Sequence, residues 1–209
     1  MTASTHPTHS THSTHSTTLR QLNGLEATPA TLADATLILV DYQNTYTRGV
    51  MALTGWEAAL ASASDLLARA RAAGATVIHV VHDGGKGSPY DLDDEIGQIH
   101  PAVAPAAGEA VVVKQAPDAF FGTDLGDRVA AAGHAQVIVI GFMTHMCVTF
   151  TAQGAFLRGL RPTVAADACA TRPIRTDVVD VSAETLHAGA LATIADLYAV
   201  VVRSGASLR

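Results

Sequence analysis

The chain has 209 residues, with 13 Lys and Arg against 19 Asp and Glu, so its formal net charge is -6. A protein that neutralises nucleic-acid phosphates needs a basic surface, and this chain has just two lysines, Lys86 and Lys114. Apolar residues make up 48% of the chain, yet no apolar run approaches the roughly 20 residues that cross a bilayer. We therefore expect a globular protein with neither a nucleic-acid partner nor a membrane segment.

The cysteines are equally scarce, since only Cys147 and Cys169 are present. The N-terminus shows no secretory-signal pattern, so we expect a cytoplasmic protein without a disulfide framework. At this length, a single domain with a sizeable core is expected.

Residues 1–24 differ from the rest of the chain because Thr, Ser and His repeat there with almost no apolar residue. Such a segment cannot offset its ordering entropy by burial, which predicts a disordered tail. The alternative is weak metal capture by histidines at a regular spacing of three residues, namely His6, His9, His12 and His15.

Short apolar runs alternate with helical patterns from Ala35 onward, which is typical of repeated strand-helix units. Thr54 and Glu57 have capping-box spacing, which predicts a helix from there to Gly74. Because Val and Ile run on without polar alternation, helices should cover both faces of the sheet. The predicted fold is α/β, a three-layer α-β-α sandwich with a mainly parallel six-stranded sheet, in one domain at 30–205. The strands are predicted at 36–41, 76–82, 110–114, 136–141, 163–166 and 199–203, and the later helices at 123–132, 145–158 and 182–196.

A long irregular stretch at 83–108 interrupts this pattern and is rich in Gly and Pro. Loops of this length inside a compact domain are usually functional or mobile, so this one is a candidate cover for a site. Its Gly84–Ser88 segment lacks the spacing of a phosphate-binding P-loop.

Three reactive side chains follow predicted strands, and ligands bind beyond the carboxyl ends of strands in an open parallel sheet. Asp41 follows the first strand, Lys114 ends the third, and Cys147 comes just after the fourth. Cys147 should lie in the first turn of a helix, where the helix dipole and a nearby ammonium favour a thiolate. Asp41 could accept the thiol proton and later protonate a leaving amine.

These residues lie in motifs that resemble those of the isochorismatase-like cysteine hydrolases, a family that includes nicotinamidases and N-carbamoylsarcosine amidohydrolases. The resemblance covers about Ala35 to Arg203 and rests on three segments in the family's order. They are Leu39-Val-Asp-Tyr-Gln-Asn44, Lys114-Gln-Ala-Pro-Asp-Ala-Phe-Phe-Gly-Thr-Asp-Leu125 and Gly141-Phe-Met-Thr-His-Met-Cys-Val148.

The resemblance implies a catalytic triad of Asp41, Lys114 and Cys147 and a covalent thioester mechanism without a cofactor. It also implies a non-proline cis peptide between Phe142 and Met143, which would aim the Met143 N-H, together with the Cys147 N-H, at the developing oxyanion. A homo-oligomer, either a dimer or a tetramer, is expected on the same ground.

The residues expected to contact the substrate are Gln43, Tyr46, Phe120, Phe142 and His145. The aromatic side chains among them could equally belong to the core. Two departures from the family pattern, His145 and Asp118, bear on the identity of the substrate rather than on the triad. No metal site is expected, because His79 and His82 are three residues apart on a strand and point to opposite faces.

The sequence therefore predicts a hydrolase that cleaves a C-N amide-type bond of a small molecule. Isochorismatase-type hydrolysis of a vinyl ether is one alternative, although the nucleophile position of that branch is commonly not Cys. A binding protein without turnover is another, which weak alkylation of Cys147 near neutral pH would favour.

Overall fold

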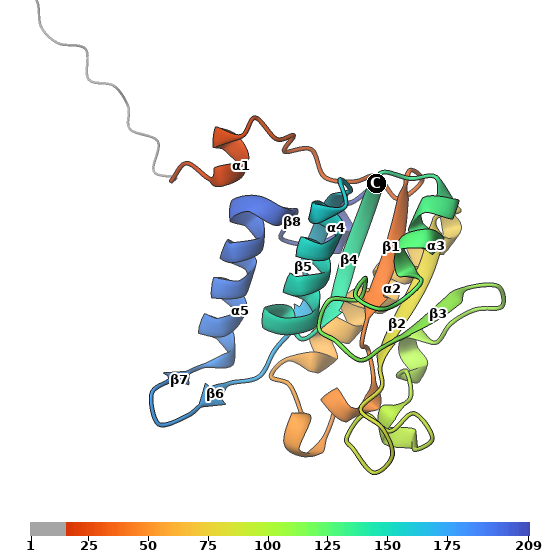
Figure 1. Ribbon diagram of the computed structural model, residues 1–209, viewed down its shortest axis with the longest axis vertical. Coiled ribbons are helices and arrows are strands. Elements are labelled where there is room, and N and C mark those ends of the chain that lie inside the picture. Colours follow the sequence, from red (N-terminus) through yellow and green to blue (C-terminus); the bar gives the residue numbers. More distant parts are fainter. Residues whose placement is uncertain (1–15) are drawn as a thin grey trace, which may run out of the picture.

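The structure is a computed structural model that describes residues 16–209. Six parallel strands form the central sheet in the order β3-β2-β1-β4-β5-β8 (Figure 1). The predicted α/β fold is confirmed. The strands are β1 (Ala35–Val40), β2 (Thr76–His82), β3 (Ala110–Lys114), β4 (Gln136–Phe142), β5 (Arg161–Ala170) and β8 (Val200–Val202).

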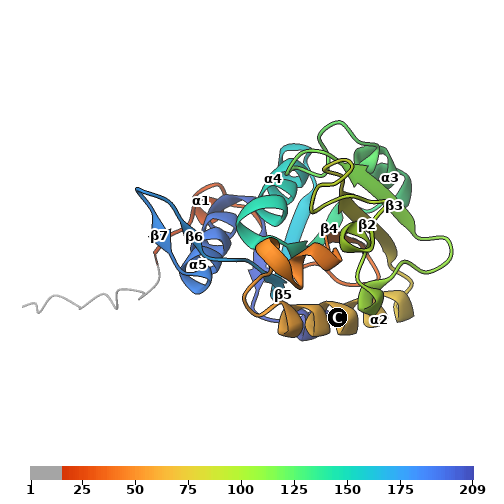
Figure 2. The same cartoon turned by 90° about the horizontal axis from the view of Figure 1, so that it is seen from below.

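Helices cover both faces of this sheet, so the fold has the three expected layers. One face carries α2 (Trp56–Ala72), and the other carries α3 (Leu125–Ala132), α4 (Thr149–Leu157) and α5 (Ala183–Thr193), as the view from below shows (Figure 2). No helix within residues 16–209 is both long and apolar enough to span a bilayer.

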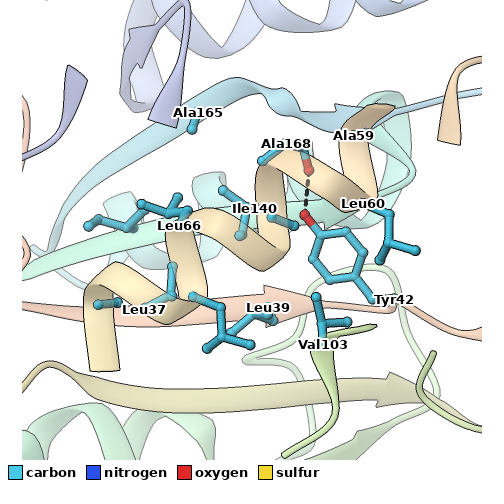
Figure 3. Close-up of a cluster of buried hydrophobic side chains, with 14 of the residues drawn as sticks. Leu37, Leu39, Tyr42, Ala59, Leu60, Leu66, Val103, Ile140, Ala165 and Ala168 are labelled. Atoms are coloured by element: carbon cyan, nitrogen blue, oxygen red, sulfur yellow. Dashed lines mark hydrogen bonds between the residues drawn. The ribbon is translucent and has the colours of Figure 1, made fainter. Parts of the chain in front are cut away.

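The core explains why β1 reads as an unbroken apolar run, because all six of its residues are buried. Leu37 and Leu39 point to the α2 side, where they pack with Leu60 and Leu66 (Figure 3). Ile38 and the residues on its side of the strand instead face α3 and α4. Successive side chains of a strand alternate between faces, so an inner strand covered on both sides needs apolar residues throughout.

The N-terminal segment differs from the prediction, because Leu19–Leu22 form a short helix, α1. Thr18 and Gln21 cap each other reciprocally, and the Leu19 N-H donates to Asp196 Oδ1 at 2.9 Å. The expected disorder of 1–24 is therefore wrong for residues 19–22. Composition could not reveal it, since the partner lies 177 residues away. Residues 1–15, with the four regularly spaced histidines, lie outside the described residues.

The start of α2 is the second difference. The expected capping box of Thr54 and Glu57 is wrong, because Gly55 is the N-cap, with a left-handed φ of 73°, and no side chain caps the helix. The Thr54 N-H instead donates to the Thr171 carbonyl at 3.0 Å. This tertiary contact with the end of β5 takes the place of the local cap. The predicted end of the helix is confirmed, since Gly74 follows it with a φ of 74°.

A small hairpin between β5 and α5 was not predicted. β6 (Ile174–Arg175) and β7 (Asp180–Val181) pair antiparallel and project from the body of the domain (Figures 1 and 2). Two-residue strands are too short to give a sequence signal.

Candidate active site

The carboxyl ends of β1, β3 and β4 bring Asp41, Lys114 and Cys147 together. Lys114 Nζ lies 2.7 Å from Asp41 Oδ2 and 3.3 Å from Cys147 Sγ. Because β2 separates β3 from β1, the long Lys114 side chain reaches across β2. The side chains of Asp41 and Lys114 have 0% exposure, and Cys147 is 6% exposed. The three residues therefore form a cluster shielded from solvent.

The backbone turns sharply at Asp41, where β1 ends. Asp41 has a φ of 53°, a left-handed conformation that is uncommon for residues other than Gly. Its N-H donates to the Val80 carbonyl at 2.9 Å, and its own carbonyl accepts from the Gln43 N-H at 2.8 Å. These bonds hold the turn in place and direct the carboxylate toward Lys114.

Cys147 lies on a π-helical turn, Thr144–Val148, rather than in the predicted α-helix, which begins only at Thr149. The wider turn is closed by an i to i+5 bond from the Val148 N-H to the Met143 carbonyl at 3.3 Å. Short π segments often occur at functional sites. The peptide between Phe142 and Met143 is cis, as the family resemblance implied.

Gly141 allows β4 to pass close to β1 just before this turn. It has a φ of 149°, and a Cβ built there would lie 2.1 Å from the Val40 carbonyl oxygen. A larger residue cannot occupy this position without moving one of the two strands that carry the cluster.

Burial dominates the electrostatics of the cluster. It raises the pKa of Asp41, although Lys114 and Cys147 oppose the shift. Burial and then Asp41 raise the pKa of the Cys147 thiol to about 12. Burial lowers the pKa of Lys114, but the neighbouring Asp41 and Cys147 outweigh it, and the net shift is upward. Burial and Asp41 therefore act against the thiolate that the helix terminus and the ammonium were expected to favour, while Lys114 acts for it.

The family model described as "Isochorismatase domain" matches residues 35–206, most of the chain. The chain belongs to the isochorismatase family. Relatives of this family are hydrolases, and so is this isochorismatase-family protein.

Individual relatives agree with this placement. A crystal structure of an isochorismatase from Pseudomonas putida KT2440 is 37% identical, with a TM-score of 0.90, and the match covers 93% of this chain and 100% of that one. The secreted isochorismatase effector Isc1 of Verticillium dahliae is 35% identical over 176 residues, which are 84% of this chain and 90% of that protein. Maleamate amidohydrolase of Pseudomonas putida is 33% identical over 145 residues, 61% of this chain and 68% of that enzyme.

The predicted substrate-contacting residues take different positions around the triad. Burial is the main cause of the raised pKa of Tyr46, and the nearby charge of Asp41 is the second cause. The ring centres of Tyr46 and Phe142 are 5.7 Å apart. His145 is half-buried and hydrogen-bonded to the Thr171 hydroxyl through Nδ1. Tyr46 and Phe142 are thus buried behind the triad, and His145 lies at the edge of the site.

Gln43 is buried and has no free amide group to offer. Its Nε2 donates to the His82 carbonyl at 2.9 Å and to the Gly97 carbonyl at 2.7 Å, and its Oε1 accepts from the His82 N-H at 2.9 Å. Its amide therefore ties the 83–108 segment to the end of β2.

Phe120 packs beneath the guanidinium of Arg158, the C-cap residue of α4, which lies 4.8 Å from the centre of the ring. The neighbouring Asp118 accepts the Phe120 N-H at 2.9 Å and lies 3.9 Å from Arg158. The second departure from the family pattern, Asp118, thus organises this turn.

Three further residues were not predicted as site residues: two border the triad, and the third, Arg172, lies near Tyr90 and His145. His82 Nδ1 lies 3.4 Å from Lys114 Nζ, and the Tyr90 ring packs 5.0 Å from the His82 ring. Arg172 carries a buried Nε without a hydrogen-bond partner among residues 16–209. Its charge lowers the pKa of His145 and opposes the rise in the pKa of Tyr90, which places it near these two residues.

Of these residues, only His82 had a signal in the sequence. His82 ends the strand predicted at 76–82, and functional residues of this fold gather at strand ends, whereas Arg172 lies well beyond the strand predicted at 163–166. Tyr90 lies in the loop and had none. Within residues 16–209, no group of three or more His, Cys, Asp or Glu side chains could hold a metal ion. His79 points away from the site and bonds Glu109 Oε2 at 2.9 Å.

Proposed function

We propose that this protein is a cysteine hydrolase that cleaves a C-N amide-type bond of a small molecule through a thioester on Cys147. The observation that carries the proposal is the placement of one ammonium, Lys114 Nζ, within 2.7 Å of Asp41 and 3.3 Å of Cys147 in a site closed to solvent. A nucleophile, an acid/base group and a fixed cation in contact meet the geometric requirements of covalent catalysis.

The raised thiol pKa defines the first step. Asp41 removes the thiol proton as Cys147 Sγ attacks the carbonyl carbon, so a C-S bond forms and the carbonyl oxygen becomes an oxyanion. Lys114 stabilises the sulfur while it carries charge. The N-H groups of Met143 and Cys147 are the proposed donors to the oxyanion, and loss of one such donor typically costs about 3 kcal/mol of transition-state stabilisation.

Two further steps complete the cycle. As the tetrahedral intermediate collapses, the C-N bond breaks and Asp41 returns its proton to the departing nitrogen, which leaves as ammonia or an amine. Asp41 then takes a proton from water as the water oxygen attacks the thioester. The C-S bond breaks, the acid product leaves, and the proton returns to the Cys147 sulfur.

The experiment that tests this function is a screen of small amides, carbamoyl compounds and ureides for ammonia release. Wild-type protein should release ammonia from at least one of them, and acid quenching during turnover should trap an acyl adduct on the Cys147 peptide. The Cys147→Ala variant should do neither. Turnover at the wild-type rate without Cys147, or pyruvate release from isochorismate that survives Cys147→Ser, would overturn the proposal.

Arg172 adds an expectation about substrate charge. A guanidinium near Tyr90 and His145 whose buried Nε has no partner among residues 16–209 favours a ligand with an anionic group. Maleamate, the substrate named for one relative, carries a carboxylate next to its amide. We therefore propose that the substrate is a small amide that also carries an anionic group.

The Arg172→Ala variant should raise the KM for maleamate by about 10- to 100-fold, because a hydrogen-bonded ion pair contributes about 1.5 to 3 kcal/mol. The KM for the methyl ester of maleamate, which lacks the charge, should change little. Steady-state kinetics with both compounds measure the difference, and Arg175→Ala, in the exposed hairpin pair with Asp180, is the matched control. Equal changes for both compounds would contradict an anion site.

We also propose that the protein is cytoplasmic, that it needs no cofactor and that it forms a homo-oligomer. One relative is a secreted protein, so the location is best tested by cell fractionation. Sedimentation of the full chain measures its oligomeric state, and a monomer at the concentration used in the assays would contradict the proposed homo-oligomer.

A further inference from the structure

The Lys114 ammonium has three N-H groups and three neighbours that can accept them. Nζ lies 2.7 Å from Asp41 Oδ2, 3.3 Å from Cys147 Sγ and 3.4 Å from His82 Nδ1. The Lys114 side chain has 0% exposure, so bulk water does not replace any of these neighbours. The first two belong to the proposed triad, whereas His82 has no role in the steps above.

We infer that His82 is a positioning residue whose neutral imidazole accepts the third N-H of Lys114 through Nδ1 and thereby fixes Nζ beside Cys147 Sγ. An imidazole nitrogen accepts a hydrogen bond only when it carries no proton. His82 must therefore be the tautomer that carries its proton on Nε2. The effect on the rate rests on the proposed function, whereas the hydrogen bond itself does not.

The fold holds His82 firmly in the place that this role requires. His82 and Lys114 are direct partners in the parallel register of β2 and β3. Both backbone groups of His82 are bound by the Gln43 amide, and the Tyr90 ring meets the imidazole edge-on at an angle of 77°. Gln43, expected from the sequence to contact substrate, thus supports Lys114 indirectly through His82.

Burial and the neighbouring ammonium both favour the neutral imidazole. Burial and then the Lys114 ammonium of β3 hold the pKa of His82 below its ordinary value of 6.5, against Asp41 of β1 and the adjacent Asp83, which act in the opposite direction. Tyr90 is the titratable group on the loop side. Protonation would turn Nδ1 into a donor that faces the ammonium, and the hydrogen bond would be lost. Catalysis should therefore fail on the acid side as His82 titrates.

Nitrogen-15 NMR of the histidine side chains tests the hydrogen bond without any substrate. His82→Gln assigns the signal by difference, and wild-type protein should show the Nε2-protonated tautomer at neutral pH with a pKa below 6.5. In Lys114→Met the pKa of His82 should rise, because the neighbouring positive charge is gone. An Nδ1-protonated tautomer in the wild type would overturn the inference, whether or not the Lys114 variant folds.

Kinetics of two variants test the positioning role on the amide that the screen identifies. His82→Gln offers an amide oxygen to Lys114 and cannot titrate, so its kcat at pH 7.5 should stay within about threefold of wild type, and its acid limb should become shallower and move to lower pH. His82→Leu leaves one N-H without a partner, a cost of about 1 to 3 kcal/mol, so kcat should fall by about 5- to 150-fold with little change in KM.

His100→Gln, on the same loop region but paired with the ring of Trp56, is the control and should keep the wild-type profile. Equal kcat values for the Gln and Leu variants, or an acid limb unchanged in His82→Gln, would overturn the role. If wild-type protein hydrolyses no compound of the screen, the proposed function fails, and the NMR result still decides whether His82 accepts from Lys114.

Discussion

Replacement of Asp41 by asparagine should lower kcat by about three orders of magnitude and, at the same time, make Cys147 easier to alkylate. General acid-base catalysis typically contributes 10²- to 10⁴-fold, and Asn cannot accept the thiol proton. The same substitution removes a negative charge that raises the thiol pKa, while Lys114 remains to lower it. The thiolate fraction at pH 8 should therefore rise about tenfold for each unit by which the thiol pKa falls.

Alkylation by iodoacetamide, followed by peptide mass spectrometry, measures the second effect. Cys169 is an internal control, because its thiol is also buried, with a pKa raised to about 12, and Asp41 is not among the causes of that shift. A variant in which Cys147 reacts more slowly than in wild type would show that Asp41 does not restrain the thiol. The opposite changes in turnover and alkylation distinguish a lost base from a misfolded site, which would alter the reactivity of both cysteines.

The same ionisation sets a pH dependence in the wild type. Asp41 must be ionised to accept the thiol proton, and its pKa is raised by burial. Activity should therefore fall, as the pH is lowered, at a higher pH than an ordinary aspartate would give. The residual activity of Asp41→Asn should lack the part of the acid limb that Asp41 causes.

Gly141→Ala should destabilise the domain by at least about 3 kcal/mol, because the new Cβ would collide with the Val40 carbonyl and the backbone conformation disfavours any side chain. For a domain of this size, that corresponds to a fall in Tm of about 6 to 12 °C. Since β1 and β4 carry Asp41 and the nucleophile turn, activity should be lost as well.

Gly126→Ala, within α3, is the matched control. A Cβ there would meet only the Phe120 side chain at 4.0 Å, and Ala is a better helix former than Gly by about 1 kcal/mol. Its Tm should be unchanged or slightly higher by differential scanning calorimetry. If both glycine variants melted at the wild-type temperature, the strands would not be as tightly held as their spacing requires.

The residues that sequence patterns located well are those fixed by periodicity. The continuous apolar runs of β1, β2 and β4 predicted the buried parallel sheet, and the positions that follow such runs pointed to Asp41 and Cys147. The end of α2 could also be predicted, because the left-handed conformation of Gly74 is a local property of the chain.

What the patterns could not supply depends on contacts between distant segments. Gly55 caps α2 because Thr54 is bonded to Thr171, and Leu19 is held by Asp196. The thiol pKa of Cys147 likewise depends on burial, which outweighs the helix terminus and the ammonium invoked from the sequence. His82 adjoins Lys114 only through the arrangement of the strand ends.

The burial and raised pKa of the two thiols have a consequence for how the protein responds to oxidants. Susceptibility of cysteine to peroxide follows thiolate character and exposure, and both Cys147 and Cys169 are buried thiols with pKa values raised to about 12. We therefore expect both thiols of the idle protein to resist sulfenic acid formation. In the proposed mechanism the sulfur becomes vulnerable only during turnover, when Asp41 takes its proton, so substrate would determine when Cys147 is at risk.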